Sequence, residues 1–94
     1  MLFVVLCIDG PNAAKLREEL GDEPRQYLID NQKSIKIAGP FLGDTGQSIG
    51  GLAIIHGETE DDVRTLIESH PLVSAGAFSR IELYAWKQLI GTAL

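Results

Sequence analysis

Residues 2–8 read Leu-Phe-Val-Val-Leu-Cys-Ile, an apolar run that ends at Asp9, Gly10 and Pro11. The run is far too short for a transmembrane helix, which needs about 20 apolar residues. It also lacks the basic start and the small-residue cleavage site that a signal peptide requires. A short apolar run that is closed by turn residues favours a strand buried on both faces. We therefore expect the chain to begin with a buried strand.

Helical and strand patterns alternate along the rest of the chain. Apolar residues recur at helical spacing in two segments, whereas alternating or continuous apolar runs mark the strands. Gly21 interrupts the first helical segment, and Asp22 and Pro24 are typical of a restart. The glycine and proline clusters at 39–40 and 43–46 predict turns. The predicted elements are a strand at 2–8, helical segments at 13–20 and from 22 onward, strands at 34–38 and 49–56, a helix at 59–69 and a strand at 79–86.

The order of these elements is β-α-β-β-α-β, which is the ferredoxin-like plan. The fold class is therefore predicted to be α+β, with an antiparallel sheet. The 94 residues are 45% hydrophobic and 22% charged, which is typical of a globular protein and excludes a disordered, collagen-like or coiled-coil chain. A chain of this length is expected to form a single domain spanning residues 1–94.

The pattern of apolar residues in the strands predicts that the protein is an oligomer. In a sheet with helices on one face, the other face meets water and the strands alternate apolar and polar residues. In residues 2–8, however, both the odd and the even positions are apolar, and the 49–55 strand is similar. A second apolar face of this kind marks an interface. We expect two sheets to pack face to face in a symmetric homodimer; the alternative is that residues 87–94 cover this face within one chain.

Charge and cysteine content exclude several functions. The net charge is −5 and the sequence pI is about 4.8, so there is no basic excess for binding nucleic acid or an anionic membrane. The single cysteine, Cys7, allows no internal disulfide and favours the cytoplasm. The two histidines have no clustered carboxylates, which argues against a metal site. No flavin, nicotinamide or haem motif is present, and therefore no cofactor is expected.

Six short motifs follow one another along the chain, namely Asp9-Gly-Pro11, Leu16-Arg17, Tyr27-Leu28, Ile37-Ala-Gly-Pro-Phe-Leu42, Gly50-Gly51 and His70-Pro-Leu-Val-Ser-Ala-Gly-Ala77. With these motifs in this order, the chain resembles the YciI-like (YCII-related) proteins of the dimeric α/β-barrel superfamily. The resemblance extends over nearly the whole chain, and its most specific parts are 38–40 and 71–76. It implies a ferredoxin-like protomer that pairs into a dimeric barrel, with a cleft in each protomer.

The resemblance also implies acid–base chemistry by a His–Asp pair at the cleft, and here the chain departs from the family. The family histidine shortly precedes the Tyr27-Leu28 position, where an ungapped comparison places Pro24. The family aspartate opens an Asp-Pro-Phe motif that reads His70-Pro71-Leu72 in this chain. A gap between Gly21 and Arg25 would change the residue at the first position, but no shift supplies a histidine. The usual pair is therefore not retained.

His70 is the first candidate for catalysis, because its ordinary pKa near 6.5 suits proton transfer at neutral pH. We expect it at the end of a helix, where the helix dipole favours the charged imidazolium. Asp22 or Glu23 is the predicted carboxylate partner, which would invert the order of the family pair. Arg25 is predicted to bind an acidic ligand, and Tyr27 to line the cleft.

Three other residues are interpreted as structural. Arg17 lies among acidic neighbours and is predicted to belong to a solvated helix face; the alternative is that it binds a carboxylate-bearing ligand bidentately. His56 is expected at a strand end, and Cys7 is expected to be a buried small hydrophobic residue. The function predicted from the sequence is a lyase or isomerase acting on a small organic compound. The alternative is a non-catalytic homodimer that binds a ligand or has a structural role.

Overall fold

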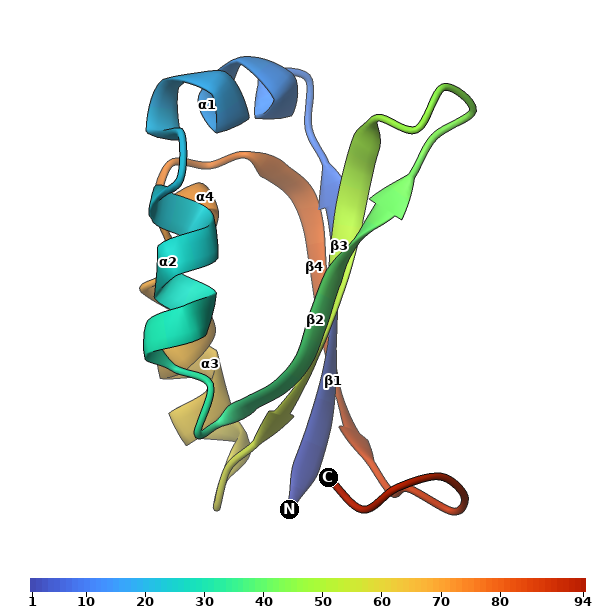
Figure 1. The fold of residues 1–94 in the computed structure, drawn as a ribbon. Coiled ribbons are helices and arrows are strands. Elements are labelled where there is room, and N and C mark those ends of the chain that lie inside the picture. Colours follow the sequence, from blue (N-terminus) through green and yellow to red (C-terminus); the bar gives the residue numbers. More distant parts are fainter.

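The computed structural model describes residues 1–94 and contains one four-stranded antiparallel sheet. All helices lie on the same face of this sheet, and the opposite face carries no helix (Figure 1). The elements are β1 (Leu2–Asp9), α1 (Ala13–Leu20), α2 (Glu23–Asp30), β2 (Ile35–Leu42), β3 (Ser48–His56), α3 (Glu60–Glu68), α4 (Pro71–Ser74) and β4 (Phe78–Trp86).

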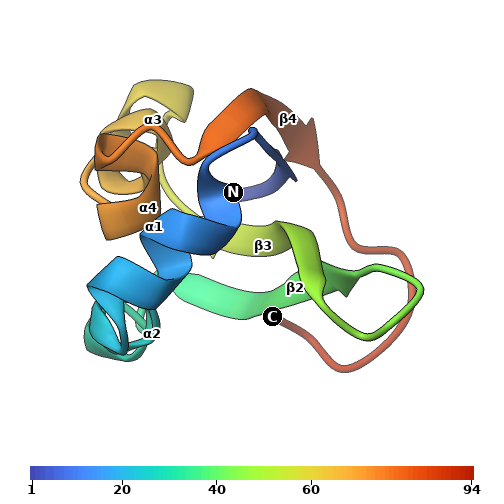
Figure 2. The same cartoon turned by 90° about the horizontal axis from the view of Figure 1, so that it is seen from above.

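The strand order is β2-β3-β1-β4, so the first strand lies inside the sheet, between β3 and β4. β1 pairs with β3 from Leu2↔His56 to Ile8↔Gly50, and on its other side with β4. This topology confirms the α+β, ferredoxin-like plan. Viewed from above, the helices form one layer and the sheet forms the second (Figure 2).

β2 is longer than the sequence pattern indicates. The strand continues through Gly39 and Pro40 to Leu42, so the turn predicted at 39–40 is wrong. β2 is an edge strand, and a proline is tolerated there because its missing N–H leaves the ladder with β3 intact. The connection to β3 lies at 43–47, where Gly46 has a positive φ of 83°. The turn predicted at 43–46 is therefore confirmed.

Both helical connections are divided into two helices. Gly21, with φ of 57°, separates α1 from α2, as its position in the sequence predicts. The second division was not predicted: α3 ends at Glu68 and the short helix α4 starts at Pro71. The proline that prevents α3 from continuing is well suited to the first turn of a new helix, because its fixed φ is already helical.

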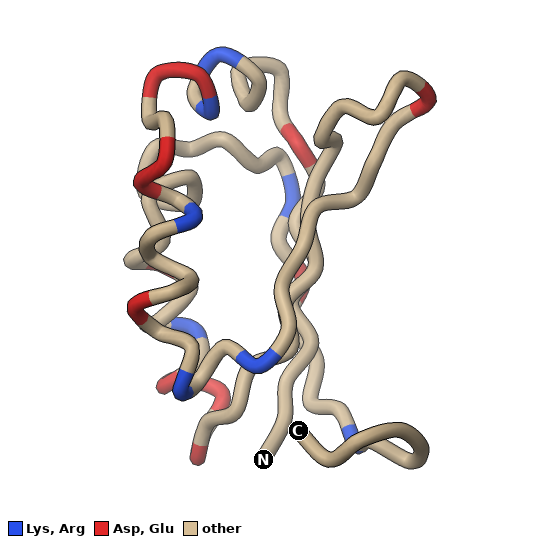
Figure 3. The backbone as a smooth tube through the Cα atoms, in the orientation of Figure 1, with Lys and Arg blue, Asp and Glu red and all other residues tan.

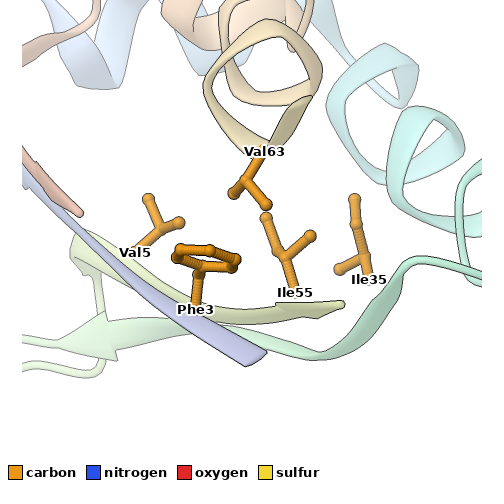
Figure 4. Packing of buried hydrophobic residues seen from close by; sticks show 5 residues of the cluster. All are labelled: Phe3, Val5, Ile35, Ile55 and Val63. Atoms are coloured by element: carbon orange, nitrogen blue, oxygen red, sulfur yellow. The ribbon is translucent and has the colours of Figure 1, made fainter. Parts of the chain in front are cut away.

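The main core lies between the sheet and α3. Five residues from four elements form it, namely Phe3, Val5, Ile35, Ile55 and Val63, and their side chains converge in Figure 4. Val63 is 1% exposed, and Leu66 and Ile67 of the same helix pack against this cluster, as their spacing predicts. A second small cluster of Ala13, Leu72 and Ala77 joins α1, α4 and the start of β4.

Charged residues lie mostly on the helices and connections, and few lie on the sheet (Figure 3). No helix combines the length and the apolar character that crossing a membrane requires.

Gly50 is required by the close approach of β1. A Cβ atom at this position would overlap the backbone oxygen of Cys7, which cannot move without disturbing the sheet. We expect Gly50→Ala to lower the free energy of unfolding by about 1–3 kcal/mol in urea denaturation. Gly39→Ala is the matched control, because nothing lies within 4 Å of its Cβ position. Equal stability of the two variants would contradict the prediction.

Candidate functional site

A cavity of about 430 Å³ lies between the sheet and the helical layer, within the usual range for small-molecule sites. Its position follows from side-chain size along the strands. At one end of the helix-facing side, Phe3 pairs with Ile55 and fills the core. Toward the other end, the paired positions on β3 and β2 are small: Ala53 faces Ala38, and Gly51 faces Pro40. The helices therefore pack closely at one end and leave a cavity at the other.

His70 lines this cavity from the connection between α3 and α4. It occupies the N-cap of α4, where its Nδ1 accepts a hydrogen bond from the backbone N–H of Leu72 at 3.2 Å. Burial lowers the pKa of His70 below its ordinary 6.5, and a backbone hydrogen bond with Pro24 opposes this shift only in part. The expectation that a helix C-terminus favours the charged form is therefore wrong, because the ring caps the N-terminus of the next helix.

The hydrogen bond from Leu72 also assigns the tautomer. An acceptor nitrogen carries no proton, so the neutral ring holds its proton on Nε2. Tyr27 packs against this ring edge-on, with 5.4 Å between the ring centroids and an interplanar angle of 84°. The Tyr27 hydroxyl donates to the carbonyl oxygen of Leu66 at 2.6 Å, and burial raises its pKa. Tyr27 is therefore a neutral, fixed wall of the cavity.

The remaining predicted site residues lie at the start of α2. Arg25 lines the cavity at its exposed rim, together with Pro24. Asp22 and Glu23 are exposed, do not line the cavity and form no hydrogen bond with His70. The structure thus brings His70, Tyr27 and Arg25 to one cavity and leaves the two carboxylates outside it.

Arg17 also lines the cavity, although its acidic neighbours favoured a solvated face. Its guanidinium donates to both carboxylate oxygens of Asp9, at 2.5 and 2.8 Å, and lies 5.9 Å from the centre of the Phe78 ring. The side chain is 25% exposed and lines the cavity, so the solvated face predicted for Arg17 is wrong. The signal in the sequence was Asp9 at the end of β1, a carboxylate that could reach a side chain on the following helix.

Cys7 lines the cavity from β1. Burial, with a smaller effect of the nearby Asp9 charge, raises the pKa of its thiol to about 11. The reactive form of cysteine is the thiolate, which this environment suppresses at neutral pH. Cys7 is therefore a small wall residue and not a nucleophile, in line with its interpretation as structural.

Comparison with known proteins places the chain in a family. Residues 1–87 match the YCII-related domain. The chain belongs to the YCII-related family. Pro24 and His70, the two positions to which the sequence resemblance assigns the family pair, both line the cavity.

Solved structures with the same fold include one with substantial sequence similarity. That structure is 5-chloro-2-hydroxyhydroquinone dehydrochlorinase (TftG) from Burkholderia phenoliruptrix AC1100, in complex with 2,5-dihydroxybenzoquinone. It is 28% identical, with a TM-score of 0.83 over 93% of this chain and 94% of TftG. The Arabidopsis thaliana protein At3g17210 is 13% identical, with a TM-score of 0.50 over 98% of each chain, and shares the fold alone. No protein of curated function matches the chain in sequence.

Proposed function

We propose that this YCII-related protein is an enzyme that binds a small hydroxylated ring compound and catalyses its isomerisation or the elimination of a leaving group. The observation that carries the proposal is the convergence of His70, Tyr27 and Arg25 on an otherwise apolar cavity of about 430 Å³. Apolar walls with a few placed polar groups are typical of a site for a small organic ligand. The similarity to TftG supports the same class of chemistry.

The chemistry in this proposal moves protons and needs no oxidant. In the loss of HCl from a chlorinated trihydroxybenzene, one hydroxyl proton moves to the ring carbon that carries chlorine. Chloride then leaves that carbon, a second hydroxyl proton is released, and the ring becomes a hydroxyquinone. Negative charge develops on a ring oxygen before the carbon is protonated. A hydrogen-bond donor that is fixed next to this oxygen would lower the barrier.

His70 is the proposed donor. Its neutral ring carries the proton on Nε2, because Nδ1 accepts the hydrogen bond from Leu72. A neutral imidazole can stabilise an oxyanion by donating this N–H, and its lowered pKa keeps the ring in that form at neutral pH. Pro24 has no N–H, so the backbone hydrogen bond of His70 with Pro24 runs from this Nε2–H to the Pro24 carbonyl, and the oxyanion would replace that carbonyl as the acceptor. Arg25 and Tyr27 are proposed to hold the ring compound beside His70. Asp22 and Glu23 remain the predicted carboxylate partners of His70. Turnover of 5-chloro-2-hydroxyhydroquinone by Asp22→Asn and Glu23→Gln tests this prediction.

A second candidate function is a non-catalytic dimer that binds a ligand. The observation in its favour is that no carboxylate lines the cavity, so His70 has no acidic partner there. A site that lost its proton acceptor would still bind the ring compound but would not convert it. Binding and turnover must therefore be measured separately.

We also propose that the protein is a homodimer that joins through the helix-free face of the sheet. Phe3 and Val5 point into the core, so Leu2, Val4, Leu6 and Ile8 of β1 point to the other face. Residues 87–94 leave much of this face uncovered, since Ile8, Ile37 and Tyr84 on it are 42%, 45% and 52% exposed. Leu89 and Ile90 of that segment are 87% and 91% exposed, and Trp86 is still 39% exposed. A second copy offers a matching apolar surface, and the cytoplasm remains the proposed location.

The decisive experiment combines calorimetric binding of 2,5-dihydroxybenzoquinone with turnover of 5-chloro-2-hydroxyhydroquinone, followed by chloride release. Saturable binding with chloride release above the uncatalysed rate is the expected result. Binding without release would establish the second candidate function. Absence of both would overturn the small-molecule site.

A cavity-filling variant identifies where the ligand binds. Ala38 lines the cavity from the exposed edge strand, so Ala38→Trp is expected to block the cavity without disturbing the buried core. We expect this variant to lose binding of 2,5-dihydroxybenzoquinone. Lys36→Trp is the matched control, since Lys36 is exposed on the same strand and does not line the cavity. Equal binding by both variants would place the ligand elsewhere.

A further inference from the structure

The charged side chains that line the cavity are all positive. The chain as a whole is acidic, with 13 acidic and 8 basic residues. The cavity nevertheless has two arginines in its wall, Arg17 and Arg25, and no aspartate or glutamate. The other titratable groups of the wall are Cys7, Tyr27 and His70, and each is neutral at pH 7 by the pKa shifts described above. The cavity is therefore electropositive within an acidic protein.

The two arginines differ in how they are held. Arg25 is exposed at the rim and forms no ion pair. Arg17 is fixed by its two hydrogen bonds to Asp9 and by the Phe78 ring beneath it. A guanidinium has five N–H donors, and two of them point at Asp9, so three remain for another acceptor. A fixed planar cation of this kind loses little conformational entropy when it binds an anion.

The surroundings of Arg17 suit an anionic ring. Phe78 lines the same cavity and offers an aromatic surface next to the guanidinium. Asp9 contacts Arg17 from outside the cavity wall and therefore does not occupy the cavity itself. With Asp9 balancing Arg17, the unpaired Arg25 leaves one net positive charge at the cavity, and one negative charge on the ligand would balance it.

We propose that the cavity selects planar ring compounds that carry an oxyanion, such as a phenolate, enolate or carboxylate, and that Arg17 is the residue that anchors this oxyanion. The inference deepens the proposed function and rests on it, because it assigns the charge of the substrate for the same cavity. Asp9 is then a positioning residue, which acts through Arg17. Arg25 attracts the anion at the rim.

Benzoate and benzamide test the proposal, because the two probes share one shape and differ in charge. We expect wild-type protein to bind benzoate more tightly than benzamide in calorimetric titrations at pH 7. Arg17→Gln is expected to weaken benzoate binding about 10- to 100-fold, the usual worth of hydrogen bonds to a charged group. Its effect on benzamide is expected to stay within about threefold. Arg17→Lys is expected to restore part of the preference for benzoate.

Several outcomes would overturn the proposal, and they separate it from the proposed function. An equal loss of affinity for benzoate and benzamide in Arg17→Gln would show that the Asp9–Arg17 pair has only a structural role. Equal affinity of wild-type protein for both probes would refute anion selection, while the ring-binding cavity would stand. Absence of binding of both probes and of 2,5-dihydroxybenzoquinone would refute the cavity as a ring site as well.

Two further variants keep the test valid. Arg64→Gln is the matched control, because Arg64 is exposed on α3 and pairs with Glu60 away from the cavity. If Arg17→Gln does not fold because Asp9 is left half-buried without a partner, the double variant Asp9→Asn with Arg17→Gln removes both charges. The double variant is expected to show the same loss of preference for benzoate, and an unchanged preference would contradict the role of Arg17.

Discussion

Val4→Lys is expected to convert the proposed dimer into a monomer, with a dissociation constant raised by about 100-fold or more. Val4 lies on β1 inside the sheet, between Ile54 of β3 and Tyr84 of β4, on the face without helices. In a symmetric dimer each substitution occurs twice, so two ammonium groups would be buried in one interface. Like charges at an interface cost several kcal/mol, and each 1.4 kcal/mol is a factor of ten.

Sedimentation velocity over a range of protein concentrations measures this effect. Ile29→Lys is the matched control, since Ile29 is a comparably exposed apolar residue on α2 at 44% exposure. We expect Ile29→Lys to remain dimeric. Tyr84→Arg, at a position that is 52% exposed on the edge strand β4, changes the same face with less risk to the fold. A wild-type monomer at about 100 μM, a usual working concentration, would refute the dimer, as would a dimeric Val4→Lys.

The strands and their order were predictable because burial imposes a simple pattern on them. β1 is apolar from Leu2 to Ile8, and its lack of alternation follows from a core on one face and the proposed interface on the other. The length of β2 was not predictable from local signals. Gly39 and Pro40 are turn residues by composition, and only the position of β2 at the sheet edge makes them compatible with a strand.

His70 and Tyr27 could be found from the sequence because their residue types carry chemistry and the resemblance placed them near a cleft. The environment of His70 could not be found, since α4 is short and its start at Pro71 was interpreted only as the end of α3. The pKa of His70 is lowered by burial, and that burial depends on how the whole chain folds around the connection between α3 and α4. Arg17 was misread because its neighbours Glu18 and Glu19 are exposed, whereas its own side chain turns toward Asp9.

His70→Asn is expected to lower turnover of 5-chloro-2-hydroxyhydroquinone about 100-fold or more, because it removes the Nε2–H donor from the developing oxyanion. Binding of 2,5-dihydroxybenzoquinone is expected to change far less. Asparagine is a good N-cap residue, so its side-chain oxygen can accept the hydrogen bond from Leu72 and preserve α4. His56→Asn is the control, since His56 lies at the end of β3 and does not line the cavity. Unchanged turnover in His70→Asn would refute the assigned role.

The same variant tests the pKa of His70 without any substrate. Burial lowers the pKa in the folded protein below the unfolded value of 6.5, so the unfolded chain binds more protons between these two values. The stability contributed by His70 is therefore fully present above pH 6.5 and is lost as the pH falls through the folded-state pKa. Urea denaturation of wild-type protein should show this loss, and His70→Asn should be less sensitive to pH in the same range. A stability difference between wild type and variant that is independent of pH would show that the imidazole has an ordinary pKa, and a minority of the rings would then be charged near neutral pH and able to donate a proton.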